Sequence, residues 1–291
     1  MMETLLEPLG FAFFQKGLLV ATLSGALLGF IGVYIVLRGM SYIGHGLSHA
    51  IFGGYAATQL FAAQFYVLGA GLWGIASAIA ITTVARRSRI GADAAIGVVT
   101  TASFALGVAL FSKFGSSGPA FDQALFGSIL GITNSQIMWL VAVCALTGLI
   151  VFFRYRALLF TTFDPDVAAA SGVKVARIEA LLMVMLSLSI LVTLTIIGVT
   201  LVAAMLVIPA VIARMLTDSF GRMLAISTVT GSACGLAGMY LSYYAGVPSG
   251  TMIVLVGAVV FLVVLGISGV RGRRRAAGLD QHSDPRPRVA A

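Results

Sequence analysis

The feature that most constrains this chain is a series of long apolar runs, each close to the roughly 20 residues that a membrane-spanning helix needs. The runs cover residues 17–37, 43–62, 66–85, 94–112, 136–153, 178–195, 197–216, 223–243 and 250–269. Residues 178–216 form one apolar block that is too long for a single crossing, so a break is expected within 193–198. The sequence predicts an all-α integral membrane protein with about nine transmembrane helices, or eight if the second and third runs include a re-entrant segment.

Composition excludes a soluble domain. Hydrophobic residues make up 59% of the chain and charged residues only 10%, whereas soluble proteins average about 25% charged residues. The mean hydropathy is +1.05. In a soluble protein the net charge of +8 would suggest a nucleic-acid partner, but here membrane topology explains the basic residues, and no nucleic acid is expected.

Lysine and arginine indicate which connections lie in the cytoplasm, because positively charged loops stay on the inner side of the membrane. Alternate connections carry Arg38; Arg86, Arg87 and Arg89; Arg154, Arg156, Lys174 and Arg177; Arg214 and Arg222; and Arg271 to Arg275. The intervening connections hold only Lys113, and Lys16 precedes the first run. This asymmetry places the N-terminus outside and the C-terminus in the cytoplasm.

The apolar runs divide the chain into three parts. Residues 1–16 form an N-terminal segment, and residues 17–270 form the membrane domain. Residues 271–291 contain few apolar residues, which predicts a disordered cytoplasmic tail.

The longest cytoplasmic connection, 154–177, contains a predicted short helix at 164–172. Asp164 is a suitable N-cap, Pro165 suits the first helical position with Asp166 after it, and Gly172 is a suitable stop. A short helix between two spans on the cytoplasmic side fits a docking element. An ordinary capped loop explains the same pattern equally well.

His45 and His49 are the residues best suited to bind a metal. They lie at positions i and i+4 near the start of the second run, so a helix places both imidazoles on one face, one turn apart. That geometry suits a transition-metal ion or proton traffic, although each histidine could instead hydrogen-bond a neighbouring helix. Two ligands do not complete a metal shell, so a second copy, another span or water must supply the rest. The third histidine, His282, lies in the tail.

Ser48 and Asp122 are weaker candidates. Ser48 lies between the histidines and superficially resembles the nucleophile of an intramembrane protease, but His49 points about 100° away from it around the helix. A packing or secondary ligand role suits Ser48 better, and an intramembrane enzyme is the least favoured alternative. Asp122, in the outward connection 114–135, could face an incoming cation or a delivery protein, or could be a solvated carboxylate.

The cysteines, Glu179 and a missing motif carry three further expectations. Cys144 and Cys234 lie inside apolar runs and are expected to be packing residues without a disulfide. Glu179 begins the sixth run and is expected to pair with Arg177 or to face the interface. No Gly-x-x-x-x-Gly-Lys-Ser/Thr motif is present, so any ATP-driven transport must use the ATPase of another chain.

Over about residues 11–268 the chain resembles the permeases of zinc- and manganese-type ABC importers. The segments that carry the resemblance occur in order: RGMSY at 38–42, LSHA at 47–50, LFGSIL at 125–130, FDPD at 163–166, ASG at 170–172, GVTLV at 198–202, IPA at 208–210, AR at 213–214, LSYY at 241–244 and PSG at 248–250. Each segment is weak alone, but the ordered set is specific.

The resemblance implies a homodimeric permease in a bacterial plasma membrane, with a cytoplasmic ABC ATPase dimer and an extracytoplasmic metal-binding protein as partners. It implies that residues 164–172 form the coupling helix seated in the ATPase, and that His49 of the Ser-His-Ala turn belongs to the metal path. The cargo would be a divalent transition metal, zinc or manganese, with ATP bound to the partner and no permanently bound cofactor. A permease for another substrate, such as haem or a metal complex, is the alternative.

The chain departs from the family pattern at His45, where many members have an aspartate. Replacing a hard oxygen ligand by imidazole favours a softer ion, zinc over manganese. The departure also leaves the identity of the metal open.

The arginine and lysine bias generates a topology prediction. A reporter fused after Arg89 or after Arg275 is expected to stay cytoplasmic, and one fused near Ser117 is expected to be exported. Paired fusions to alkaline phosphatase and to a fluorescent protein, which are active on opposite sides of the membrane, measure this directly. A cytoplasmic signal at Ser117 would contradict the orientation.

Overall fold

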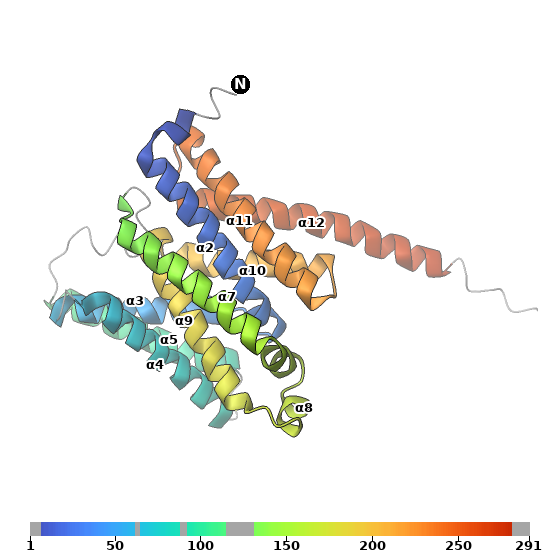
Figure 1. The fold of residues 1–291 in the computed structure, drawn as a ribbon, viewed down its shortest axis with the longest axis horizontal. Coiled ribbons are helices and arrows are strands. Elements are labelled where there is room, and N and C mark those ends of the chain that lie inside the picture. Colours follow the sequence, from blue (N-terminus) through green and yellow to red (C-terminus); the bar gives the residue numbers. More distant parts are fainter. Residues whose placement is uncertain (1–6, 62–64, 88–91, 115–130, 281–291) are drawn as a thin grey trace, which may run out of the picture.

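The computed structural model describes residues 7–61, 65–87, 92–114 and 131–280, and in these ranges the chain is helical and contains no strand (Figure 1). The helices are η1 (Glu7–Gly10), α2 (Ala12–Leu37), α3 (Ile43–Phe61), α4 (Tyr66–Arg87), α5 (Ala92–Phe114), α7 (Asn134–Phe163), α8 (Pro165–Ala170), α9 (Val175–Ile197), α10 (Val199–Leu216), α11 (Phe220–Ala245) and α12 (Ser249–Asp280). The predicted all-α fold is confirmed.

Each of the nine apolar runs coincides with one long helix, but fewer helices are clearly long and apolar enough to cross a bilayer. Seven helices of the described ranges meet that standard, and α10 contributes a shorter apolar stretch, Leu201–Leu216. The α3 helix is not among the seven, because its two histidines and four glycines lower its hydropathy. The count of nine spans stays a prediction.

The long apolar block is divided at Gly198, inside the interval expected from the sequence. Gly198 ends α9 and precedes α10, its N–H donates to the carbonyl of Leu194, and its φ is 83°. A positive φ strains any residue with a Cβ atom, so glycine suits the break between these two successive helices.

Helices α2 and α11 pack against each other through their backbones. A Cβ atom added to Gly231 would lie against the carbonyl oxygen of Gly25, and one added to Gly29 would lie 2.7 Å from the carbonyl oxygen of Ser227. The Ser227 hydroxyl donates to the Gly29 carbonyl at 2.6 Å. Small residues of this kind allow close helix contacts where lipid offers no hydrophobic drive for association.

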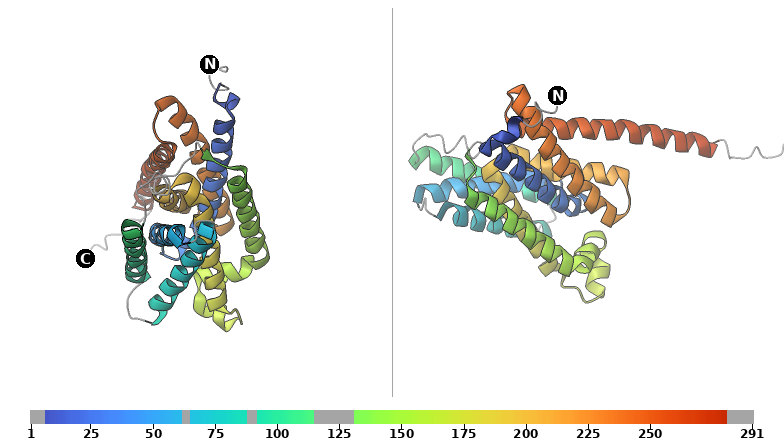
Figure 2. Two further views of the ribbon diagram at one scale, coloured as in Figure 1. Left: turned by 90° about the vertical axis from the view of Figure 1, so that its left-hand side faces the viewer. Right: turned by 45° about the horizontal axis from the view of Figure 1, so that its top comes forward.

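A second group of helices lies beside this pair. The α3 helix contacts α5 and α4 on its flanks and also reaches α9 and α10. The α9 and α10 helices also contact α2, so they join the two groups. The α12 helix packs on α10 and α11 and then projects away from the bundle (Figure 2).

The two cysteines and the C-terminal end of the chain were also expected from the sequence to have a particular structure. Cys144 and Cys234 are free thiols, half-buried and buried respectively, as expected. The α12 helix continues to Asp280, beyond the last apolar run, whereas 281–291 lie outside the described residues. The limit of the tail at 271 therefore stays a prediction.

The glycine contact between α2 and α11 predicts opposite effects for two substitutions in one helix. Gly231→Ala is expected to destabilise the protein by about 1–3 kcal/mol, because the added methyl group meets backbone rather than a flexible side chain. Gly221→Ala, with no atom within 4 Å of its added Cβ, is expected to be neutral or to stabilise by up to about 1 kcal/mol through helix propensity. Thermal unfolding in detergent measures both. Equal effects of the two substitutions would refute the close contact.

Candidate functional site

The α3 helix presents His45 and His49 on one face. Their ring centroids lie 4.5 Å apart with planes at 72°, and both side chains are half-buried. Tyr42 lies 5.5 Å from the His45 ring, and Phe104 of α5 lies 4.9 Å from the His49 ring. The two imidazoles therefore form the polar centre of a row of rings that starts before α3 and ends on α5.

This pair can supply two ligands to one ion. Imidazole nitrogens bind zinc at about 2.0–2.1 Å, and rings 4.5 Å apart on successive turns can both turn a nitrogen toward a shared centre. Within the ranges that the structure describes, no group of three or more His, Cys, Asp or Glu residues gathers as a metal site. The pair is therefore an incomplete ligand set within one copy of the described chain.

Ser48 occupies a different environment from the two histidines that flank it. Its side chain is fully buried, and its hydroxyl donates to the backbone carbonyl of His45 at 2.8 Å. The hydroxyl proton is thus held by the helix backbone, which disfavours a nucleophile activated by a histidine base. The oxygen keeps lone pairs for a secondary ligand role.

The histidine helix lies close to α5 because its glycines leave room. A Cβ atom at Gly46 would lie 2.7 Å from a methyl group of Ile96 and 2.9 Å from the methyl group of Thr100. Gly53 meets the backbone of Ser103 in the same way. These close approaches fix the distance between the imidazole face and Phe104 on the neighbouring helix.

A hydrogen-bonded chain joins α3, α4 and α5 beside His49. The indole N–H of Trp73 donates to the Ser103 hydroxyl at 2.5 Å, and that hydroxyl donates to the carbonyl of Ala50 at 3.3 Å. Ala50 directly follows His49, and Ser103 directly precedes Phe104. Trp73 and Ser103 therefore link α4, α5 and α3 to one another next to the His49 ring. Neither residue was expected from the sequence, although a polar group inside an apolar run is a sign that it has a partner on another helix.

The expected capped helix is present as α8. The Asp164 carboxylate accepts from the backbone N–H groups of Asp166 at 3.1 Å and Val167 at 2.9 Å, with Pro165 in the first turn. Gly172 follows the helix with a φ of 81°. The α8 helix packs mainly on α7 and also on α9, and Phe163 and Val167 expose 58% and 54% of their surface. It is a short helix at one end of the bundle (Figure 1), with exposed apolar side chains.

One candidate residue cannot be placed. Asp122 lies in 115–130, outside the described residues, as does the LFGSIL segment. Its expected role at the outer side stays a prediction.

Comparisons with known proteins agree over nearly the whole chain. The model of the ABC 3 transport family matches residues 10–268. The manganese transport system membrane protein MntC of Halalkalibacterium halodurans is 36% identical over 266 residues, covering 91% of each chain. A probable iron transport system membrane protein of Haemophilus influenzae is 32% identical, covering 94% of this chain and 100% of that protein.

A solved structure is similar to the same extent. In PsaBC from Streptococcus pneumoniae in complex with Fab, one chain superimposes with a TM-score of 0.81 at 32% identity, covering 91% of this chain and 95% of that one. An inward-facing metal-chelate type ABC transporter has a TM-score of 0.70 at 19% identity, covering 86% of this chain and 85% of that chain, and supports the fold alone.

The cap of α8 generates a prediction that isolates one hydrogen-bonding group. Asp164→Ala removes the acceptor for two backbone N–H groups and is expected to cost about 1 kcal/mol, whereas Asp164→Asn keeps a capping oxygen. Hydrogen exchange at the amides of Asp166 and Val167 is therefore expected to accelerate in the alanine variant and to change little in the asparagine variant. Equal exchange in both variants would show that the side chain does not cap α8.

Proposed function

Because the chain belongs to the ABC 3 transport family and is a permease of its metal importers, we propose that it carries divalent transition-metal ions inward along a path that includes His45 and His49. The observation that carries this proposal is the pair of imidazoles, with ring centroids 4.5 Å apart, in a helix whose other residues are uncharged. Ionisable groups within membrane helices are costly and usually face a partner or a pathway.

Manganese is the proposed principal cargo. Relatives at 36% identity from Halalkalibacterium halodurans and Listeria monocytogenes are named manganese transport proteins, and two relatives at 32% are named for iron. Manganese prefers oxygen ligands, whereas imidazole suits softer ions such as zinc. His45 is therefore the specific feature that makes zinc the second candidate.

The proposed path needs ligands from beyond one copy of the chain. His45 and His49 supply two, and a second copy of the permease together with water would complete the shell. In this assembly the N-terminus lies outside, the C-terminus lies in the cytoplasm, and nine helices cross the membrane. Asp122, in the outward connection, would face the extracytoplasmic metal-binding protein that delivers the ion.

The energy source would lie in a partner. The chain has no phosphate-binding Gly-x-x-x-x-Gly-Lys-Ser/Thr motif, so it would act as a transporter subunit and not as an enzyme. We assign α8, with Asp164, Pro165, Asp166 and Gly172 defining its ends, as the helix that docks in a cytoplasmic ABC ATPase dimer. The exposed Phe163 and Val167 side chains would fill an apolar recess of that partner.

Substitutions at the histidines test the path. His49→Ala is expected to lower metal uptake at least about tenfold, since removing even an outer partner of a metal site costs this much. His45→Asp is expected to retain uptake and to raise the uptake of manganese relative to that of zinc, because a carboxylate suits the harder ion. The readout is uptake of labelled manganese and zinc by cells that express the complete importer and lack their own.

His282→Ala is the matched control, because it removes the third imidazole outside the membrane domain. It is expected to import at the wild-type rate. Native uptake by the His45→Ala/His49→Ala double variant would rule out the proposed path.

A further inference from the structure

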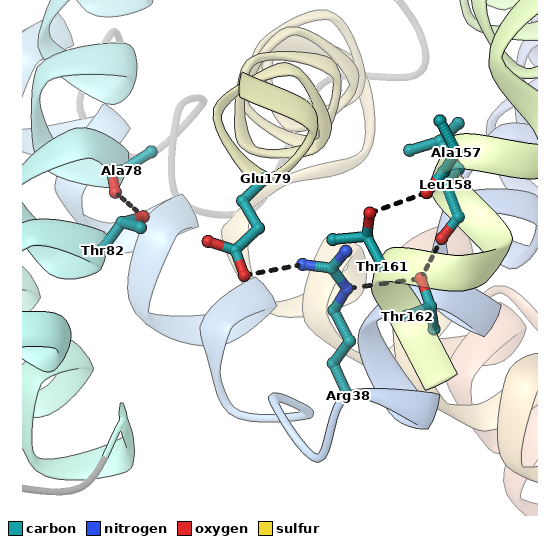
Figure 3. A network of polar contacts seen from close by, with 8 residues as sticks. All are labelled: Arg38, Ala78, Thr82, Ala157, Leu158, Thr161, Thr162 and Glu179. Atoms are coloured by element: carbon teal, nitrogen blue, oxygen red, sulfur yellow. Dashed lines mark hydrogen bonds and ion pairs between the residues drawn. The ribbon is translucent and has the colours of Figure 1, made fainter. Parts of the chain in front are cut away.

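Arg38, at the end of α2, is a buried residue whose side chain contacts two other helices. It directly follows α2, and its side chain is only 9% exposed. One guanidinium nitrogen lies 3.9 Å from a carboxylate oxygen of Glu179 in α9, and its Nε donates to the Thr162 hydroxyl of α7 at 3.4 Å. Figure 3 shows the guanidinium group between these two side chains.

The Thr162 hydroxyl can only accept from Arg38, because its own proton is already used. It donates to the carbonyl of Leu158 at 2.7 Å, as the Thr161 hydroxyl does to Ala157 (Figure 3). Thr162 lies two residues before Asp164, the N-cap of α8. A displacement of α8 therefore reaches the Arg38 contact over a very short length of chain.

An aromatic contact runs parallel to this polar one. The Phe163 ring lies 5.9 Å from Phe220 of α11, and Phe220 lies 5.3 Å from Tyr34 of α2. Tyr34 is fully buried and stands one helical turn before Arg38. The last two residues of α7 thus reach the end of α2 by two separate routes, one polar and one aromatic.

The same arginine adjoins the histidine helix. Residues 38–42 form a tight turn in which Met40 N–H donates to Ile35 at 3.1 Å and Ile43 N–H donates to Met40 at 2.9 Å. The α3 helix starts at Ile43, two residues before His45. Movement of Arg38 would therefore be passed to the start of α3 through a short hydrogen-bonded turn.

We propose that Arg38, held by Glu179 and Thr162, is a positioning residue that transmits movement of α8 to the histidine helix α3. This inference rests on the proposed ATP-driven import. A buried charge separated from its partner is strongly disfavoured, so the ends of α2, α7 and α9 move as one unit. Arg38 contacts Thr162 in the helix before α8 and Glu179 in the helix after α8. A shift of α8 therefore moves Arg38 and, through the turn at 38–42, changes the position of α3.

The test compares metal import with ATP hydrolysis in the reconstituted importer of permease, ATPase and binding protein. Glu179→Gln and Thr162→Val are expected to keep assembly and ATP hydrolysis but to lower the metal imported per ATP by about fivefold or more, the range of an ordinary coupling between sites. Thr162→Ser keeps the accepting hydroxyl and is expected to restore the ratio. Asp218→Asn is the matched control, because it neutralises an exposed carboxylate in the turn before α11. It is expected to leave the metal imported per ATP unchanged.

Hydrogen exchange at residues 43–48 supplies a second readout that does not depend on transport. Nucleotide binding to the ATPase is expected to alter this exchange in the wild type and not in Glu179→Gln. If import and ATP hydrolysis fell in proportion in both variants, Arg38 would have a structural role only, and the proposal would be overturned. It would also be overturned if both variants imported as much metal per ATP as the wild type. Failure of the proposed function is separate, because it would appear as absence of metal import in the wild-type importer.

Discussion

In the hydrocarbon interior of a bilayer, water is not available to a polar group, and the arrangement of this protein depends on that constraint. Helices satisfy the backbone, and most hydroxyls donate to the carbonyl four residues earlier. This pattern recurs at Thr82, Thr100, Ser187, Ser189 and Thr228. Other polar side chains reach between helices: Trp73 and Ser103 beside the histidine helix, Arg38 next to α8, and Ser227 between α11 and α2. In such a chain, an ionisable side chain that makes contacts between helices is a candidate for function.

Features set by local sequence were predictable. The helices follow from apolar runs, the break at Gly198 follows from the length of one run, and the α8 cap follows from the order of Asp164, Pro165 and Gly172. The spacing of His45 and His49 also fixed their shared face before any tertiary contact was known. Each of these depends on residues within a few positions of one another, where helix geometry alone decides the outcome.

Features set by helix packing were not predictable in the same way. Glu179 was expected to pair with Arg177 or to face the interface, yet the ion pair in the structure joins it to Arg38, on a helix much earlier in the chain. Residues two apart on a helix do not face each other, so the nearby arginine was a poor guide. The Trp73–Ser103 bond likewise depends on how closely α4 and α5 approach α3, which glycine content suggests only in general.

The backbone contact between α2 and α11 has a consequence for motion. Side chains at most helix interfaces can change rotamer, and that freedom lets one helix slide past another at small cost. Where Gly25 meets Gly231 no side chain lies between the helices, so this interface lacks that freedom. The two helices are therefore expected to move together, as one rigid body.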